Sequence, residues 1–467
     1  MTPEAKDGEV LVAQGDAAAA ARGLASGDSA APTSILDCEP EVVAAGAPPP
    51  GSVTAERGRT AALPPPLPGT ALEGTVHLKS GRDGPVRAGH PWVFSGAVRE
   101  IEGSPFEGAF VRVLGAEGNV LGVGSYSAVG SLTVRMFTRA EVPLDAGFVR
   151  ERLRDAHALR KSVGMTGPRA GFRLINAEGD GMPGVVVDVY GGFAVVQLLS
   201  AGAERLRPEV IDALCNDLGV RGVVERSTGG SRRAEGLRDV TGLAAGEEPP
   251  AEIEIDEHGM RLLVDIRGGQ KTGFYLDQRG ARALVRRLAP GRRVLNAFAY
   301  PGAFAVAAGL GGAAEVVSVE TSGPSLELAR RSWALDARLV SAQTSWVCGD
   351  AFEALDAERG RARFDLIVLD PPPFARHRSD LERAMRAYRD LNRRALEALA
   401  PGGLLLTCSC SPHVSRESFV RAVAGAARAP LRAQVLAQLG FEPDHPVLPA
   451  HAEGEYLKGL LVRPAVG

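Results

Sequence analysis

Two short segments in the last quarter of the chain combine residue types that can do chemistry. The first is DPPPF (370–374), which follows the apolar run LIVL (366–369), and the second is CSC (408–410), which follows LLLT (404–407). Short apolar runs of this kind are typical of buried strands. In an open parallel sheet, ligands bind beyond the carboxyl ends of the strands. We therefore expect the carboxylate of Asp370 and the thiols of Cys408 and Cys410 to share one pocket.

A thiol beside a carboxylate suits chemistry at carbon 5 of a pyrimidine, which is a poor nucleophile by itself. Attack of a cysteine sulfur on carbon 6 makes carbon 5 carbanion-like, so that it can take a methyl group from a sulfonium. Loss of the carbon 5 proton and expulsion of the sulfur complete the cycle. Asp370 would support protonation of the ring nitrogen. Phe374 would stack on a base taken out of its helix, in a loop that Pro371 and Pro372 stiffen.

Each of these residues also has a plainer interpretation. The proline run can be a rigid connection between a strand and a helix. Cys408 and Cys410 can be two inert core thiols, or half of a zinc site, although no second Cys/His pair lies nearby. The basic stretch from Arg376 to Arg389 lies beside the expected pocket, where it can contact phosphates or form a solvated helix face.

A cofactor site is indicated by acids that end successive strands. VLNAFAYPGAF (294–304) is a strand that runs into a tight turn at Gly302 and then into a helix, whose start presents free N–H groups. Glu320 follows 18 residues later, where nucleoside-binding α/β folds hold a ribose diol, and Asp350 can receive an adenine amino group. The alternative is that each acid only caps a helix. The expected cofactor-binding residues of this region are Asn296, Phe298, Tyr300, Gly302, Glu320, Asp350 and Asp370.

The missing phosphate-binding motifs narrow the choice of cofactor. No GxGxxG follows the first strand of this region, and no GxxxxGK[ST] occurs in the chain. A nucleoside without phosphates therefore fits better than a dinucleotide or a nucleotide, and S-adenosylmethionine is the common one.

The elements that must position these residues alternate from about residue 253 onward. We expect strands at 293–298, 315–320, 345–349, 364–369 and 403–409. Helices are expected between them at 303–310, 324–337, 351–358 and 381–399. Strands that alternate with helices form βαβ units, so the prediction is a parallel sheet covered by helices on both faces.

The chain before this half divides into three regions. Residues 1–70 are rich in Ala, Pro, Gly and acids, which predicts a disordered tail. Short alternating runs from residue 75 to about 137 predict a small β-barrel. Residues 145–255 predict a compact α+β unit with helices at 145–165 and 203–218. In the barrel, Lys79 and Arg87 lie near His90 and Trp92, either as an RNA-contacting surface or as a solvated face.

The bulk composition predicts a cytoplasmic protein without membrane segments. Hydrophobic residues make up 45% of the 467 residues, enough for sizeable cores. The net charge is -3, but residues 1–70 carry -5, so the rest carries +2, which neither requires nor excludes RNA. Five cysteines form a poor disulfide framework, which favours reduced thiols. The start MTPEAKDGEV has no signal-peptide pattern, and no run of 18 apolar residues occurs.

Taken together, the motifs resemble a known family, the bacterial PUA-domain class I methyltransferases that form 5-methylcytosine in large-subunit ribosomal RNA (the RlmI-like family). The resemblance runs in order across residues 75–467. It is carried by HPWVFSGAV (90–98), AEGDGMPGVVVD (177–188), VQLLSAGAE (196–204), DEHGM (256–260), LLVDI (262–266), KTGFYLDQR (271–279), VLNAFAYPGAFAV (294–306), VLDPPPF (368–374), CSCS (408–411), DHPV (444–447) and EGEYLKG (453–459). The combination of KTGFYLDQR, DPPPF and SCS is highly specific.

The resemblance implies an α/β architecture in three folded parts. These are a PUA-like RNA-binding barrel (73–143), a central α+β domain of EEHEE-like type (145–255) and a Rossmann-like class I methyltransferase domain (256–467) with an antiparallel last strand. It also implies that Cys410, the cysteine of the final Ser-Cys-Ser, attacks the base. Further cofactor-binding residues implied by it are Tyr275, Asp277, Gln278 and Arg279. The expected RNA contacts are Pro371, Pro372, Phe374, Arg376, Lys79 and Arg87.

Two positions depart from the family pattern. YPGAF (300–304) stands where the family usually has Tyr-Thr-Gly-Gly-Phe, and Cys408 stands where it tends to have Phe. Cys408 is therefore a second thiol that could replace the first as nucleophile.

The prediction is an S-adenosylmethionine-dependent enzyme that methylates carbon 5 of a cytosine in ribosomal RNA. It needs no metal, and a homodimer is compatible with it. Two alternatives stay open: methylation of a guanine or an exocyclic amine without a cysteine nucleophile, and a non-catalytic RNA-binding assembly factor.

Overall fold

The computed structural model of the chain describes residues 72–375, 377–427 and 431–466. The expected tail at residues 1–70 and the expected RNA contact Arg376 lie outside these residues. No helix in the described part of the chain is both long and apolar enough to cross a membrane.

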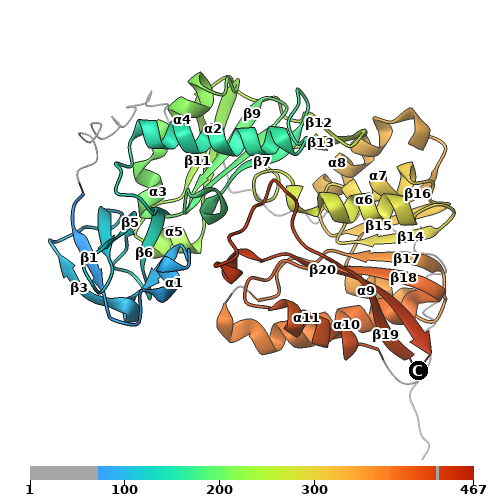
Figure 1. Cartoon of the computed structure of the whole chain (residues 1–467). Helices are drawn as coiled ribbons and strands as arrows, with labels where there is room; N and C mark the ends of the chain where they lie inside the picture. The colour runs from blue at the N-terminus through green and yellow to red at the C-terminus, as the bar shows by residue number, and fades with distance from the viewer. Residues whose placement is uncertain (1–71, 376, 428–430, 467) are drawn as a thin grey trace, which may run out of the picture. The chain divides into compact units, whose positions relative to one another are not determined.

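The first folded region is a six-stranded sheet (Figure 1). Its elements are β1 (Thr75–Leu78), α1 (Gly84–Arg87), β2 (Trp92–Phe94), β3 (Val98–Glu102), β4 (Phe110–Leu114), β5 (Val120–Tyr126) and β6 (Leu132–Thr138). The strand order is β2-β6-β5-β4-β1-β3, and all neighbours are antiparallel except β1 and β4. Val76, Val111 and Val134 have no exposed surface and belong to the core of this sheet.

The second region is a five-stranded sheet with helices. Its elements are α2 (Ala146–Ser162), β7 (Gly171–Asn176), β8 (Val185–Tyr190), β9 (Phe193–Leu198), α3 (Ala201–Arg205), α4 (Arg207–Asn216), β10 (Gly222–Ser227), α5 (Gly230–Ala234) and β11 (Val240–Gly246). The strand order is β11-β10-β9-β8-β7, with only β9 and β10 parallel. Leu153 of α2 and Val210 of α4 share a core with alternate residues of the strands, so the two helices cover this sheet.

The third region begins with a hairpin and continues as alternating strands and helices. Its first elements are β12 (Ile253–Glu257), β13 (Met260–Val264), α6 (Arg279–Leu288), β14 (Arg293–Ala297), α7 (Ala303–Leu310), β15 (Glu315–Glu320), α8 (Gly323–Ala334) and β16 (Gln343–Cys348). Its last are α9 (Ala351–Ala357), β17 (Phe364–Leu369), α10 (Leu381–Ala398), β18 (Leu399–Ser409), α11 (Arg416–Ala424), β19 (Leu431–Leu439) and β20 (Lys458–Val466). Short 3-10 turns include η3 (Leu276–Gln278).

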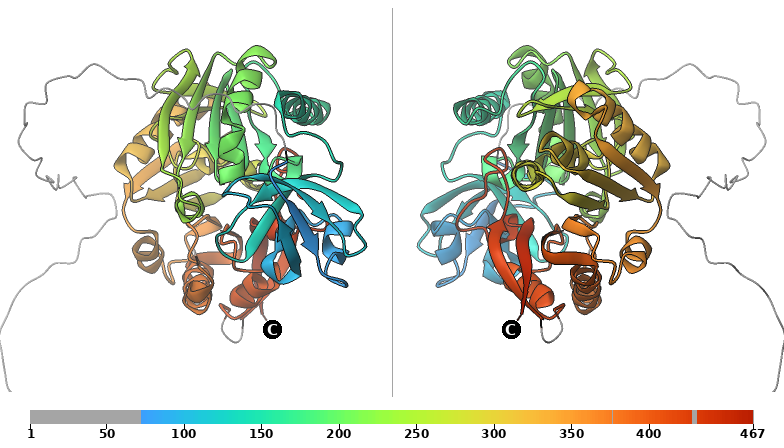
Figure 2. Two further views of the ribbon diagram at one scale, coloured as in Figure 1. Left: turned by 90° about the vertical axis from the view of Figure 1, so that its left-hand side faces the viewer. Right: turned by 90° about the vertical axis from the view of Figure 1, so that its right-hand side faces the viewer.

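The third region is built on a seven-stranded sheet in the order β16-β15-β14-β17-β18-β20-β19. The first five strands are parallel, whereas β20 is antiparallel to both of its neighbours. The red pair β19 and β20 lies side by side at one edge (Figure 2). Helices α6, α7 and α8 pack on one face and α9, α10 and α11 on the other (Figure 1). This is the expected doubly covered α/β sheet with an antiparallel last strand.

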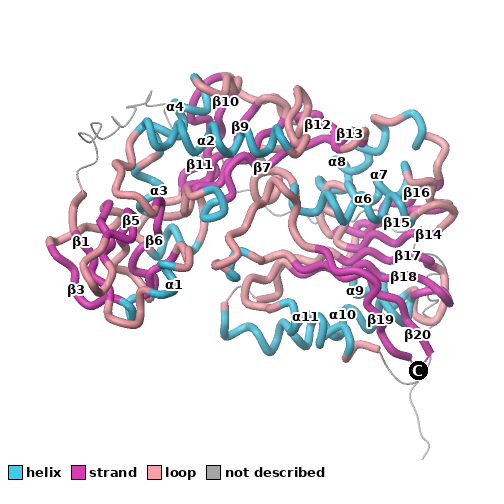
Figure 3. The backbone as a smooth tube through the Cα atoms, viewed as in Figure 1, coloured by secondary structure: helices cyan, strands magenta, loops and turns pink. Residues whose placement is uncertain are grey.

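The loop between β19 and β20 connects the third region to the second. It leaves the sheet and runs toward β7 (Figure 3), where the carboxylate of Asp444 accepts a hydrogen bond from the backbone N–H of Arg173 at 3.1 Å. A C-terminal segment therefore packs against a strand that lies some 270 residues earlier in the chain.

Three details of the expected elements differ. The expected helix at 203–218 is two helices, α3 and α4, because Pro208 lacks the N–H that a continuous helix would need. Strand β18 begins at Leu399 rather than at residue 403, and Gly402 allows this with φ 77°. The boundary expected between residues 255 and 256 falls inside β12, whose Ile255 is buried in the core of the third region.

Candidate active site

A cavity of about 300 Å³ opens at the carboxyl ends of the parallel strands, where β14 separates β15 from β17. This is the edge at which ligands bind in open parallel sheets. The expected site residues that line it are Tyr275, Asp277, Gln278, Phe298, Tyr300, Glu320, Asp350, Asp370, Pro371, Pro372 and Cys410. The structure therefore brings the expected cofactor acids, the carboxylate and one of the thiols to one place.

The turn after β14 is held in an uncommon backbone conformation. Phe298 (φ 61°), Tyr300 (φ 33°) and Gly302 (φ 76°) all have positive φ. A Cβ on Gly302 would lie 2.5 Å from the Cβ of Ala329, so glycine is required for the approach of α8. Such strain persists only where neighbours hold it. Here the backbone N–H of Tyr300 donates to Oε2 of Glu320 at 3.0 Å.

Glu320 and Asp350 shape the loops of the cavity as well as lining it. Glu320 accepts hydrogen bonds from the backbone N–H groups of Tyr300 and Ser322, both at 3.0 Å. Asp350 is the N-cap of α9 and accepts from the N–H of Phe352 at 2.7 Å. The capping interpretation is therefore correct for Asp350. It does not exclude ligand binding, because a carboxylate has about four acceptor sites.

Asp277 lines the same cavity with an almost completely buried side chain. Its Oδ2 accepts from the hydroxyl of Tyr456 at 2.7 Å and lies 3.7 Å from Nζ of Lys271. Burial would raise its pKa, but Lys271, His445 and the Tyr456 hydroxyl together lower the pKa to about 2. Oδ1 is buried and has no hydrogen-bond partner among the described residues. An unpaired buried carboxylate oxygen is costly unless a ligand donates to it.

The cavity fits the nucleoside and the charged amino acid part of S-adenosylmethionine. The carboxylate of Asp277, which has an oxygen without a partner among the described residues, suits the ammonium group, and Glu320 and Asp350 are acceptors for hydroxyl and amino groups. Asn296 of β14 does not line the cavity: it is completely buried, and its amide nitrogen and oxygen have no partner within the part of the chain described.

Asp370 is held in a form that titrates near neutrality. Nε2 of Gln278 donates to its Oδ1 at 2.8 Å. Burial and the negative charge of Asp277 raise the pKa of Asp370 to about 7, against the opposite effects of Lys271 and Gln278. At neutral pH a sizeable fraction of Asp370 is therefore protonated and can donate a hydrogen bond or a proton.

The two cysteines differ although they are two residues apart. Cys408 lies within β18, is 1% exposed and contacts Oε1 of Gln278 with its sulfur at 3.8 Å. Cys410 follows the end of the strand, lines the cavity and lies 3.9 Å from the carbonyl oxygen of Pro371. Burial raises the pKa of both thiols, that of Cys410 to about 11. Only Cys410 is open to a substrate in the cavity.

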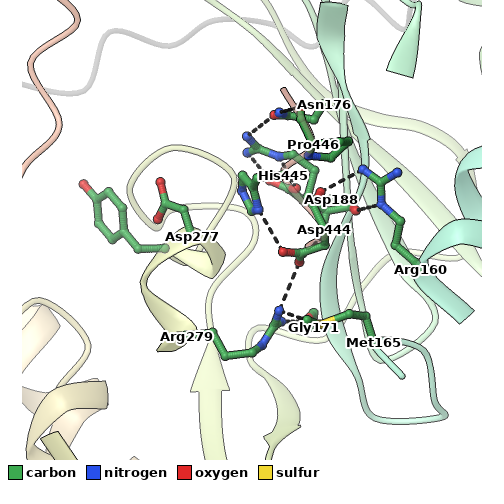
Figure 4. Close-up of polar contacts among 12 residues, drawn as sticks. Arg160, Met165, Gly171, Asn176, Asp188, Asp277, Arg279, Asp444, His445 and Pro446 are labelled. Carbon is green, nitrogen blue, oxygen red and sulfur yellow. Dashed lines mark hydrogen bonds and ion pairs between the residues drawn. The ribbon is translucent and has the colours of Figure 1, made fainter. Parts of the chain in front are cut away.

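Arg279 is an expected cofactor residue that the structure places elsewhere. Its guanidinium donates to the carbonyl of Gly171 at 2.6 Å and pairs with Asp444 at 3.2 Å (Figure 4). Arg160 of α2 donates to the backbone carbonyl of Asp444 at 2.7 Å. These buried contacts join the second and third regions, so Arg279 belongs to the contact between them and not to the cavity.

The expected RNA contacts are spread over the structure. Phe374 lies outside the cavity lining, with its ring centre 4.7 Å from the ring centre of Tyr388. Lys79 is exposed and donates to the carbonyl of Gly96 at 3.2 Å. Arg87 is also exposed and pairs with Asp83 at 2.8 Å. Pro371 and Pro372 do line the cavity.

Three residues of the site had no role in the sequence analysis. Lys271 lines the cavity with φ 51°, and its Nζ lies 4.4 Å from the ring centre of Tyr275. Tyr456 binds Asp277, and Lys458 is buried beside the turn that follows Cys410. The sequence contained a signal for these three residues, because they lie in KTGFYLDQR and EGEYLKG, two of the motifs that carry the family resemblance. Within the described residues, no three His, Cys, Asp or Glu side chains converge as a metal site.

Comparisons with known proteins agree with this geometry. Residues 239–463 match the family model for S-adenosylmethionine-dependent methyltransferases, and residues 76–139 match the model for a PUA-like domain. Fold and site thus define an S-adenosylmethionine-dependent methyltransferase with an N-terminal PUA-like domain. Ribosomal RNA large subunit methyltransferase I of Salmonella arizonae is 42% identical over 389 residues, which cover 83% of this chain and 96% of that protein. This chain belongs to the ribosomal RNA large subunit methyltransferase I family.

Two further relatives extend the comparison. The protein of the same name from Citrobacter koseri is 41% identical, over 83% of this chain and 98% of that protein. The crystal structure of SMU.776 complexed with SAH has a TM-score of 0.72 with 23% sequence identity, and the match covers 83% of this chain and 99% of that one. At this identity the likeness concerns the fold.

Proposed function

We propose that this protein methylates carbon 5 of a cytosine in large-subunit ribosomal RNA through a covalent bond to Cys410. One observation carries the proposal: Cys410 and Asp370 line the same cavity as Asp277, Glu320 and Asp350. A nucleophile, an acid and a donor-binding set therefore meet at one edge of the sheet. The names of the relatives support ribosomal RNA of the large subunit as the substrate.

The donor half of the cavity is assigned to S-adenosylmethionine. Asp277 would hold the ammonium group, and Glu320 and Asp350 would hold the hydroxyl and amino groups of the adenosine. When bound, S-adenosylmethionine supplies a methyl group that its sulfonium makes electrophilic. The turn from Phe298 to Gly302 is held in a fixed backbone conformation, so this side of the donor half is formed without a ligand.

The base half of the cavity is assigned to a cytosine taken out of its stack. The Cys410 sulfur, as thiolate, forms a bond to carbon 6, and the electron pair moves toward carbon 5. Protonated Asp370 donates its proton to nitrogen 3, which accepts the negative charge that the attack delivers into the ring. After carbon 5 has been methylated, nitrogen 3 returns its proton to Asp370 and the carbon 5 proton is lost to solvent, so that the bond between sulfur and carbon 6 breaks and restores the Cys410 thiolate and the aromatic ring.

The PUA-like sheet is assigned to RNA contact outside the cavity. Lys79 and Arg87 are exposed on it and keep donors beyond those used for Gly96, Asp83 and Asn119. Contacts of this kind to phosphates would position the RNA without reading its sequence.

Trapping with a modified RNA tests the proposal. Large-subunit RNA transcribed with 5-fluorocytidine should form a stable protein–RNA adduct in the presence of S-adenosylmethionine, because fluorine at carbon 5 cannot leave as the proton does. The variant C410A should bind S-adenosylmethionine normally and form no adduct. C348A, which removes an exposed cysteine outside the cavity lining, is the matched control and should trap RNA as the wild type does.

The outcomes separate the alternatives. Methylated RNA without an adduct, and full activity of C410A, would point to a guanine or an exocyclic amine as the acceptor. Absence of binding to S-adenosylmethionine in calorimetry would favour a non-catalytic RNA-binding factor. Mapping 5-methylcytosine in ribosomal RNA from cells with and without the protein would identify the nucleotide.

A further inference from the structure

Lys458 is a buried lysine next to the turn that carries the nucleophile. It is the first residue of β20 and only 1% exposed. In the antiparallel register of β18 and β20 it lies opposite Ser409, one residue before Cys410. Its Nζ donates to the carbonyl oxygen of Ser411 at 2.7 Å, one residue after Cys410. Lys458 therefore holds the turn on both sides of the thiol.

The same ammonium group also reaches the donor half of the site. Nζ donates a second hydrogen bond to the carbonyl oxygen of Tyr456 at 2.7 Å. The hydroxyl of Tyr456 in turn donates to Oδ2 of Asp277 at 2.7 Å. One side chain thus ties the turn with Cys410 to the segment that positions the carboxylate assigned to the methyl donor.

A buried ammonium group needs a compensating interaction. Among the described residues, Lys458 forms no ion pair with a carboxylate. The nearby carboxylate of Glu455 pairs with Arg416 instead. Two neutral carbonyl oxygens compensate a buried charge only in part, because an ion that is removed from water loses its favourable hydration. A negative charge that forms at Cys410 would complete the compensation.

We propose that Lys458 is a positioning residue for the methylation reaction, which fixes the Cys410–Ser411 turn and stabilises the Cys410 thiolate by its buried positive charge. The inference rests on the proposed role of Cys410 as nucleophile. It gives a function to a lysine that, among the described residues, neither lines the cavity nor pairs with a carboxylate.

The charges around the thiol agree with this role. Burial raises the pKa of Cys410 to about 11, Lys271 and Lys458 lower it, and Asp370 and Asp277 raise it. Burial lowers the pKa of Lys458 to about 8, while Cys410 opposes that shift, so Lys458 is mostly cationic at pH 7. The ionisable groups that interact with the two residues are Lys271, Asp277, Asp370, Tyr275, Tyr388, Cys408, Arg416 and Glu455.

Alkylation of Cys410 by iodoacetamide tests the proposal without RNA or methyl donor. The full-length protein is alkylated between pH 7 and 10, and the rate at Cys410 is read by tandem mass spectrometry, which separates it from Cys408. Loss of the charge in K458M should lower the rate at neutral pH about tenfold, which is one unit in the thiol pKa. K458Q keeps donors to the carbonyls but no charge, and should show the same shift of the pH profile.

K458R keeps the cation and its donors, and its rate should stay within about threefold of the wild type. K161M removes an exposed lysine of α2 and should change nothing. Folding of each variant is checked by thermal unfolding. A folded K458M or K458Q with the wild-type pH profile would overturn the proposal. If neither folds, K458R decides: a rate that falls tenfold in a folded K458R would also overturn it.

The result is independent of the test of the proposed function. If wild-type protein traps no 5-fluorocytidine RNA, the nucleophile assignment fails whatever the alkylation shows. If trapping is normal but the alkylation rate of Cys410 does not change in the Lys458 variants, only the proposed role of Lys458 is wrong.

Discussion

Nε2 of Gln278 donates to Oδ1 of Asp370 at 2.8 Å, and Oε1 of the same amide lies 3.8 Å from the sulfur of Cys408. Gln278 is 3% exposed and belongs to η3, whereas Asp370 follows β17. A buried amide thus fixes the carboxyl group that we assign to the base. The same amide is also a hydrogen-bond acceptor for the Cys408 thiol within the protein itself.

Replacing Asp370 should make the folded protein more stable at alkaline pH and should strongly reduce its methylation activity. The folded-state pKa of Asp370 is about 7, above the ordinary 3.8, so the folded protein holds this proton more tightly than the unfolded chain. Stability therefore falls as pH rises from about 4 to 7 and stays lower above 7. D370N should remove this penalty, at most about 4 kcal/mol, while methylation falls about 100-fold or more.

Thermal unfolding at pH 5 and pH 8.5 checks this expectation, since the gain of D370N should be larger at pH 8.5. The matched control is D365N in β17, the strand that Asp370 follows. Hydrogen bonds from Arg293 outweigh burial and lower the pKa of Asp365, so D365N should not gain stability at high pH. A D370N protein no more stable than wild type at pH 8.5 would contradict the buried-acid argument.

Removing the hydroxyl of Tyr456 should weaken binding of the methyl donor. Y456F loses the 2.7 Å hydrogen bond to Asp277, a cavity-lining residue whose other oxygen has no partner among the described residues. We expect the dissociation constant of S-adenosylmethionine to rise about tenfold, measured by isothermal titration calorimetry. Y126F, on β5 in the first sheet, is the control and should bind as the wild type does. Equal affinities of Y456F and wild type would argue against Asp277 as a donor contact.

Replacing Asp444 should loosen the contact between the second and third regions. Asp444 is completely buried and pairs with Arg279 at 3.2 Å and with His445 at 2.9 Å (Figure 4). Burial opposes ionisation, but His445 and Arg279 hold the pKa of Asp444 well below its ordinary value. A lowered folded pKa stabilises the protein above pH about 4, and this stabilisation is lost as pH falls further.

D444N should therefore lower the unfolding temperature at pH 7, with a loss of about 3 kcal/mol for a broken buried pair. The difference from wild type should shrink below pH 4. D155N, at an exposed position of α2, is the control and should unfold with the wild type. A pH-independent difference would mean that the amide disturbs packing and not charge.

Cys408 should not replace Cys410 as the nucleophile. It is 1% exposed, and burial raises its pKa well above that of a free thiol. C408A should still form the adduct with 5-fluorocytidine RNA, with a modest loss of rate because Gln278 loses a neighbour. An adduct that survives in C410A and disappears only in the double variant would assign the attack to Cys408.

Local sequence patterns determined the positions of the strand-end residues. Asp370, Glu320 and Asp350 follow apolar runs of strand length, and the parallel strands of a βαβ sheet bring their carboxyl ends to one edge. Tyr275, Asp277 and Gln278, which the family resemblance put forward as cofactor-binding residues, line the same cavity.

Only the tertiary structure decided which way individual side chains turn. Asp277 lines the cavity, whereas Arg279, two residues later, contacts Asp444 and Gly171 outside it. The two side chains diverge because positions two apart at the start of a helix lie on different sides. Lys458 reaches Ser411 across 47 residues because β20 enters the sheet antiparallel beside β18. Such contacts depend on strand order and register, which arise from packing of the whole domain and have no local sequence signal.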